Sequence, residues 1–201
     1  MLITRYTKIV LAASLAVFCL LAAFGNITDY GTNYLAVQHV LSMDTTFPGN
    51  ALMYRSITTP ALWQLAYGLI IAAEALAGIL FLAGAIQLFQ MRDAPGAAFN
   101  QAKFYVIAAC LVALLIWFFA FMVIGGEWFA MWQSQAWNFQ QGAFRFYLTV
   151  LAVLIFVNQP DGDFVSPKPA SAQKSAPAKR KSTRTPTRRR ADRGRRRADT
   201  L

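Results

Sequence analysis

Histidine, cysteine and acidic residues are all scarce in this sequence. Its 201 residues include one His, two Cys and nine Asp or Glu. A disulfide framework or a zinc site needs several such side chains, and haem held between helices usually needs two axial ligands. We therefore expect His39 to be a solvated loop residue, and Cys19 and Cys110, both inside apolar stretches, to act as small hydrophobes. No metal and no cofactor is expected.

The sequence motifs of common enzyme classes are also missing. The chain contains no Gly-x-Ser-x-Gly, no phosphate-binding loop, no dinucleotide fingerprint and no His-Glu-x-x-His. These absences argue against an ordinary hydrolase or nucleotide-dependent enzyme, although not against a membrane-embedded one. We expect no catalytic residues.

Long apolar stretches dominate the first 160 residues instead. The hydrophobic residues (AVILMFWYC) make up 57% of the chain, a high share for a globular protein. A helix needs about 20 apolar residues to cross a bilayer, and four stretches qualify, at about residues 9–28, 62–89, 104–126 and 141–159. The predicted fold class is all-α, an integral membrane four-helix transmembrane bundle, in a domain comprising residues 1–165.

Two of the four stretches have an alternative interpretation. The first could be a cleaved signal peptide, because Arg5 and Lys8 precede it and Ala23-Phe24-Gly25 offers small residues at a cleavage site. The long apolar run favours a retained helix. The fourth could be a re-entrant segment, since only residues 146–157 are strongly apolar. Four spans are favoured, because an odd number would place the basic C-terminal segment outside.

The distribution of Lys and Arg predicts an orientation. Basic residues are retained on the cytoplasmic side during insertion, and seventeen of the nineteen fall on one side of the four-span arrangement, leaving only Arg55 and Arg145 on the other. Distant residues of a long tail contribute little; without them the bias is four (Arg5, Lys8, Arg92, Lys103) to two. Both termini are predicted to be cytoplasmic, in a bacterial inner (cytoplasmic) membrane.

Residues 166–201 differ in composition from the rest of the chain. They are rich in Arg, Lys, Pro and Ala and include thirteen basic residues, which predicts a disordered cytoplasmic tail. Beside an anionic leaflet each basic residue contributes about 1 kcal/mol, so anionic lipid headgroups are the expected partner. Nucleic acid is disfavoured, because no aromatic residue for base stacking follows Phe164.

Glu74 lies inside the second apolar stretch, near its middle, where an acidic side chain costs about 2.5–3.5 kcal/mol. On a helix it shares a face with Tyr67. One hypothesis is a proton or cation site, or a ligand anchor. The other is a protonated carboxyl that forms an assembly contact across the bundle. Arg145, near the outer end of the fourth stretch, could pair with Glu74 or equally with Glu127.

The two predicted exported loops contain most of the remaining polar signals. In the first, residues 35–41 could form a short amphipathic helix or strand. In the second, Trp128, Trp132 and Trp137 predict a helix lying on the outer leaflet, because indole rings prefer the headgroup level.

Three motifs in these loops carry a resemblance to a known family. They are Asn26-Ile-Thr-Asp-Tyr-Gly-Thr-Asn33, Gln38-His-Val-Leu-Ser-Met-Asp-Thr45 and Gly125-Gly-Glu-Trp-Phe-x-Met-Trp-Gln133. Over roughly residues 1–165 the chain resembles a bacterial family of predicted small integral membrane proteins (domain of unknown function 2165). The resemblance implies a four-span inner-membrane protein and carries over no activity. The motifs indicate an exported-face cluster, where the two loops would pack together or bind a partner: Asn26, Asp29, Tyr30, His39, Asp44, Glu127 and Trp128.

The leading functional hypothesis is a non-enzymatic accessory or scaffold subunit with a folded exported face. It would act with other membrane proteins or as a homo-oligomer. The alternative is a small transporter or channel-like protein that uses Glu74 as a protonatable site. A membrane enzyme or quinone-linked subunit ranks last, because no redox ligand set is recognisable.

Overall fold

A computed structural model describes residues 2–163, and within them the fold is all-α, as predicted. The predicted tail, 166–201, and its proposed binding to anionic lipid lie outside the described residues. Four helical segments are long and apolar enough to cross a membrane. They are α1 (Leu2–Thr28), α3 (Pro60–Gln90), the run formed by α4 (Gly96–Gln101), α5 (Phe104–Leu114) and the π-helix η2 (Leu115–Trp128), and α6 (Gln140–Asn158).

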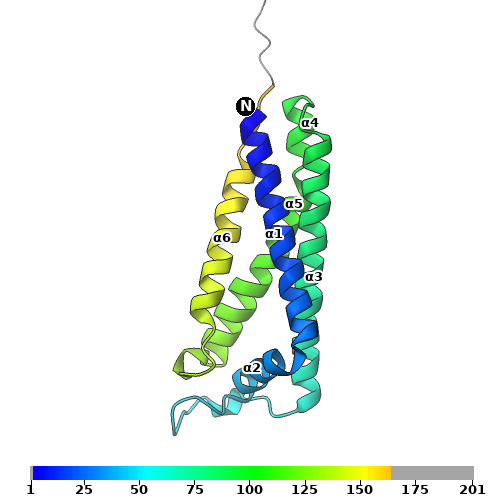
Figure 1. The fold of residues 1–201 in the computed structure, drawn as a ribbon. Helices are drawn as coiled ribbons and strands as arrows, with labels where there is room; N and C mark the ends of the chain where they lie inside the picture. Colours follow the sequence, from blue (N-terminus) through cyan, green and yellow to red (C-terminus); the bar gives the residue numbers. More distant parts are fainter. Residues whose placement is uncertain (1, 164–201) are drawn as a thin grey trace, which may run out of the picture. The chain divides into compact units, whose positions relative to one another are not determined.

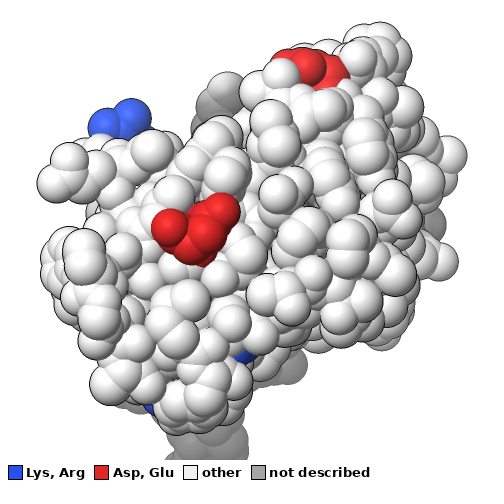
Figure 2. All heavy atoms as spheres, turned by 90° about the horizontal axis from the view of Figure 1, so that it is seen from below, with Lys and Arg blue, Asp and Glu red and all other residues white. Residues whose placement is uncertain are grey.

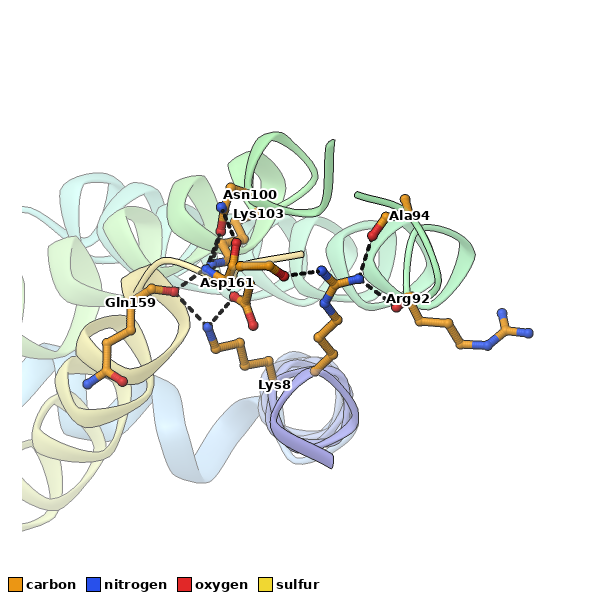
Figure 3. A network of polar contacts seen from close by, with 9 residues as sticks. Lys8, Arg92, Ala94, Asn100, Lys103, Gln159 and Asp161 are labelled. Atoms are coloured by element: carbon orange, nitrogen blue, oxygen red, sulfur yellow. Dashed lines mark hydrogen bonds and ion pairs between the residues drawn. The ribbon is translucent and has the colours of Figure 1, made fainter. Parts of the chain in front are cut away.

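Figure 1 shows how these helices are arranged. α1 packs along α3, α3 along α5, and α6 against α5 and η2. The N-terminus and α4 lie at one end of the bundle. We call it the basic end, because Lys8 and Lys103 lie there (Figure 3) and Arg5 is hydrogen-bonded to the turn between α3 and α4. The short helices α2 (Tyr30–Ser42), η1 (Met53–Arg55) and η3 (Met131–Gln133) belong to the loops at the opposite end.

The outward faces of the long helices are apolar. Between 57% and 62% of the side-chain surface is exposed at Val17 and Leu21 on α1 and at Leu65, Leu69 and Ile79 on α3. In water, a continuous exposed surface of this kind would drive association. In a bilayer it is the favourable arrangement, because the lipid chains solvate it. The chain is therefore an integral membrane protein.

Small side chains occupy many of the buried positions between the helices. Ala12, Cys19, Ala77 and Cys110 are fully buried, and both cysteines are free thiols. Glycine allows the closest helix approach: a Cβ at Gly84 would lie 2.6 Å from Val106 Cγ2 and 2.9 Å from its backbone nitrogen. Small residues at such contacts let membrane helices gain packing energy where no hydrophobic effect drives them together.

The loops at the end opposite the basic end form a folded cap, defined as residues 29–59 and 129–139. Its two segments share a small apolar core of Met43, Phe129 and Ala130. Hydrogen bonds also cross between them: Thr45 Oγ1 donates to Ser134 Oγ at 2.8 Å. The stretch 35–41, for which helix and strand were both open, is part of the helix α2.

The predicted surface helix around the three tryptophans is wrong. After η2 the backbone turns through the left-handed conformation at Ala130 (φ 49°), and only one 3₁₀ turn, η3, follows. The reason is burial: Phe129, Ala130 and Met131 are at most 4% exposed. This segment packs into the cap instead of lying flat on a leaflet.

Gly84→Ala is predicted to destabilise the bundle, because its new methyl group meets the Val106 backbone, which cannot move aside. Overpacking of this kind costs about 1–3 kcal/mol. Gly68→Ala in the same helix is the matched control, since nothing lies within 4 Å of its Cβ position; it should be neutral or stabilising by up to about 1 kcal/mol. Thermal unfolding of the detergent-solubilised variants measures both. Equal midpoints for the two variants would contradict the packing argument.

Candidate functional site

The carboxyl of Glu74 belongs to a small polar cluster inside the bundle. Asn26 of α1 donates from Nδ2 to Glu74 Oε2 at 2.7 Å. Tyr67 lies on the same face of α3 as Glu74, and its hydroxyl donates to the backbone oxygen of Asn26 at 2.8 Å. Glu74 is 4% exposed and Tyr67 2%. The structure thus joins Glu74 and Tyr67 through Asn26, a residue that sequence reasoning placed with the exported face.

This contact also changes the depth expected for Glu74. The residue lies near the middle of α3, but its partner Asn26 is two residues from the end of α1 at Thr28. Side chains on a helix tilt toward its N-terminus, and the N-terminus of α3 leads into the cap. The carboxyl therefore lies in the half of the bundle near the cap. Its position in the middle of the apolar stretch suggested a site farther from the cap.

A cavity of about 430 Å³ lies against this cluster. Four polar residues, Asn26, Asn33, Tyr67 and Glu74, contribute to its wall. The rest of the wall is almost entirely apolar and comes from α2, α3, η2 and the loop after η2; it includes Ile70, Ile116, Phe121, Ile124 and Phe139. π-helical turns in α-helices occur frequently at functional sites, and here η2 provides one side of the cavity.

Arg145 does not join this cluster. Its side chain is exposed on α6, and within residues 2–163 no ion pair links it to Glu74 or Glu127. Among the residues that the structure describes, no Lys, Arg or His lines the cavity. In the part of the chain that the structure describes, Arg145 thus pairs with neither of the two carboxyls considered for it, Glu74 and Glu127.

The residues of the predicted exported-face cluster divide into separate groups. His39 Nδ1 lies 2.9 Å from both carboxylate oxygens of Asp44, and the His39 ring stacks on Trp137 with centroids 4.6 Å apart. Tyr30 instead contacts Tyr67, edge to face at 4.8 Å, beside the Glu74 cluster.

Glu127 and Trp128 form a third group with Arg55. The Arg55 guanidinium donates to the backbone oxygens of both residues, at 3.4 Å and 3.2 Å, and lies 4.7 Å from the Trp128 ring centroid. Asp29 is exposed and precedes α2. Figure 2, viewed from the cap, shows only isolated acidic and basic side chains on a largely uncharged surface.

At the basic end the structure shows a network that sequence reasoning missed (Figure 3). Asp161, in the segment after α6, accepts on Oδ2 from Lys8 Nζ at 2.5 Å and from Lys103 Nζ at 2.6 Å. Both ammonium groups also donate to the Gln159 backbone oxygen at 2.7 Å. Asn100 also belongs to the network. Its Nδ2 donates to the Asp161 backbone oxygen and its Oδ1 accepts from the Asp161 backbone nitrogen, both at 2.9 Å.

Arg5 ties the same segment to the turn between α3 and α4. It is fully buried and donates to the backbone oxygens of Arg92, Ala94 and Gly162 at 2.8, 2.6 and 3.0 Å. Its guanidinium also lies 4.5 Å from the Phe99 ring centroid. Three of the basic residues that predict the orientation thus also hold the helix ends together.

The charge of Asp161 is maintained by its neighbours. Burial of the carboxyl disfavours the charged form, but the hydrogen bonds and positive charges of Lys103 and Lys8 outweigh this effect and lower the pKa of Asp161 below its ordinary value. The network therefore acts as a structural clamp built on a charged carboxylate.

Within the described residues, no group of three or more His, Cys, Asp or Glu side chains is placed to hold a metal ion. Comparisons with known proteins give one match. A family model described as predicted small integral membrane protein (DUF2165) matches residues 4–160, which confirms the resemblance seen in the three motifs. No curated protein and no solved structure matches the chain significantly.

Asp161→Ala is predicted to destabilise the protein strongly, because it leaves two buried ammonium groups without a counter-charge. Loss of one partner of a buried pair costs about 3–5 kcal/mol. Asp93→Ala is the control: its carboxylate is 70% exposed and 3.4 Å from Arg92, and exposed pairs contribute about 0–1 kcal/mol. Unfolding in detergent, followed by tryptophan fluorescence, should separate the two variants; similar losses would refute the clamp.

The stability of the protein at low pH provides a second test of the Asp161 network. A lowered pKa in the folded state contributes stability above the unfolded value of about 3.9, and this stability is lost as the pH falls through the folded value. Below about pH 4 the native protein should therefore lose more stability than Asp161→Asn, which cannot titrate at this position.

Proposed function

Because the chain belongs to the family of predicted small integral membrane proteins (DUF2165), we propose that it is a non-enzymatic accessory or scaffold subunit of a bacterial inner membrane. Both termini would be cytoplasmic, together with the basic end, and the cap would be exported. Binding of the tail, 166–201, to anionic headgroups remains a prediction from its composition.

The observation that carries this proposal is the folded cap. Two loops separated by α3, α4, α5 and η2 form one surface with its own core and cross-loop hydrogen bonds. Gln133 is central, because its Oε1 accepts from the Phe47 backbone nitrogen and from Asn50 Nδ2, both at 3.1 Å. Loops fixed in this way reach a partner already ordered, which reduces the entropy cost of association.

The surface of the cap also has the side chains of an interface. Phe47, Tyr54 and Trp132 of the cap are 50–75% exposed, and Trp128, the last residue of η2, is 49% exposed beside them. Aromatic residues are enriched at protein interfaces, where their large apolar area contributes most of the binding energy. A neighbouring membrane protein, or a second copy of this chain, is the partner that such a surface suits.

Gln133→Ala is predicted to reduce partner binding, since it removes both hydrogen bonds that join η3 to the first loop. Gln135→Ala in the same segment is the control, because its side chain is exposed. Full-length tagged protein is solubilised gently and its co-purifying proteins are identified. A stoichiometric partner should accompany the native chain and Gln135→Ala but be depleted from Gln133→Ala. Purification of the native chain alone, as a monomer, would overturn the accessory role.

A second candidate, the small transporter or channel-like protein, is favoured by one observation. Glu74 is a buried carboxyl on the wall of the cavity, and none of the described residues that share this wall is basic. A carboxyl in such a place can exchange a proton or hold a cation during transport.

Glu74→Gln separates this candidate from a purely structural role. If Glu74 carries protons, the variant should abolish proton flux into reconstituted vesicles, read with a trapped pH-sensitive dye, while the bundle assembles normally. If Glu74 is an assembly contact, Glu74→Gln should be nearly silent and Glu74→Ala should weaken the bundle through loss of the bond to Asn26. Glu127→Gln, at an exposed acidic residue, is the control for a general effect of removing charge.

A further inference from the structure

The cavity has the size and composition of a small-molecule site. Its volume of about 430 Å³ falls in the range of about 300–1,000 Å³ found for ligand pockets. Such pockets combine a mostly apolar wall with a few polar groups that orient the ligand. Here three of the polar residues are gathered together, because Tyr67 and Glu74 both form hydrogen bonds with Asn26.

One oxygen of this polar group is left for a ligand. Glu74 Oε2 accepts from Asn26, whereas Glu74 Oε1 accepts no hydrogen bond from any residue that the structure describes. The Tyr67 hydroxyl is already used, since it donates to the Asn26 backbone. A ligand that donates a hydrogen bond would thus find its acceptor at Glu74.

The charge of the wall selects the kind of donor. A carboxylate away from water is costly unless a positive charge accompanies it, and within residues 2–163 no Lys, Arg or His belongs to the wall. A positively charged ligand would supply the missing charge. Phe121, Phe129 and Phe139 add aromatic rings to the same wall, and the faces of such rings attract organic cations.

The opening of the cavity indicates how the ligand arrives. Leu69 of α3 and Leu115 of η2 line the cavity and are 61% and 51% exposed, so the cavity is open at these residues. Both belong to segments long and apolar enough to span the membrane. The cavity is therefore reached between α3 and η2 from the lipid side, which favours a molecule with an apolar body.

We propose that this cavity binds a lipophilic organic cation, with its ammonium group on Glu74 and its apolar body along η2 and α3. This binding site is additional to the proposed accessory role and does not depend on that role. It does not require transport either, because binding at equilibrium needs no movement of the ligand across the membrane. Should transport occur, the same chemistry would define its substrate class.

Photocrosslinking in lipid nanodiscs tests the proposal with a defined probe. The probe is dodecylamine carrying a diazirine on its chain, and the matched probe is the corresponding dodecanol, which partitions into lipid but has no charge. The amine should label peptides of α3 and η2, and unmodified dodecylamine should compete. In Glu74→Gln, where the amide can still accept from Asn26, labelling should fall at least about tenfold, which corresponds to about 1.4 kcal/mol.

Substitution of two neighbouring alanines provides an independent test of the site. Ala73 lines the cavity, whereas Ala72 is exposed on the outside of α3. Ala73→Phe should therefore abolish labelling by filling the cavity, and Ala72→Phe should leave it unchanged. Equal amine labelling of the native protein, Glu74→Gln and Ala73→Phe would overturn the site. Labelling by dodecanol as strong as that by the amine would overturn the charge requirement.

Discussion

The arrangement of the helix ends depends on the buried ion pairs of Asp161. Lys8 comes from α1, Lys103 from the junction of α4 and α5, and Asp161 from the segment after α6, so one carboxylate connects three of the four spans. Charges removed from water are tolerated only when they are paired and hydrogen-bonded. Asn100 and the Gln159 backbone supply those additional bonds, and so α6 can end only where this network forms.

The opposite half of the bundle has a different construction. α1 ends at Thr28 and α2 turns away from the bundle direction, while α5 gives way to the π-helix η2. Toward the cap, α6 and η2 diverge from α1 and α3, and α2 lies across the space between them (Figure 1). The cavity lies in this region.

The sequence predicted the features that depend on composition. Four long apolar stretches can only be helices in a bilayer, because each backbone polar group must be satisfied within its own segment. The site depends on contacts between segments distant in the chain, and these were predicted only in part. Glu74 was recognised from its cost, but Asn26 was assigned to the exported face, since nothing local shows that α1 ends beside the middle of α3.

The contacts of the basic residues could not be predicted from the sequence either. Arg5, Lys8 and Lys103 were interpreted as determinants of orientation, and counting charges cannot reveal that their side chains are at most 3% exposed. Asp161 gave a signal that could have been used, because an acidic residue directly after a span must face the basic residues expected at the same end. The surface helix predicted from three tryptophans failed for a related reason: exposure was assumed where Phe129 and Met131 are buried.

The two buried acidic groups differ in one respect that bears on function. Asp161 has two ammonium groups within 2.6 Å, whereas Glu74 has one amide donor and, among the described residues, no positive charge on the cavity wall. Packing alone does not require a carboxyl at position 74, because an apolar side chain of similar size would avoid its desolvation cost. A carboxyl buried at such a cost, with no counter-charge among the described residues that line the cavity, is complementary to a cationic ligand. A cation that arrives from the membrane satisfies that complementarity in both charge and polarity.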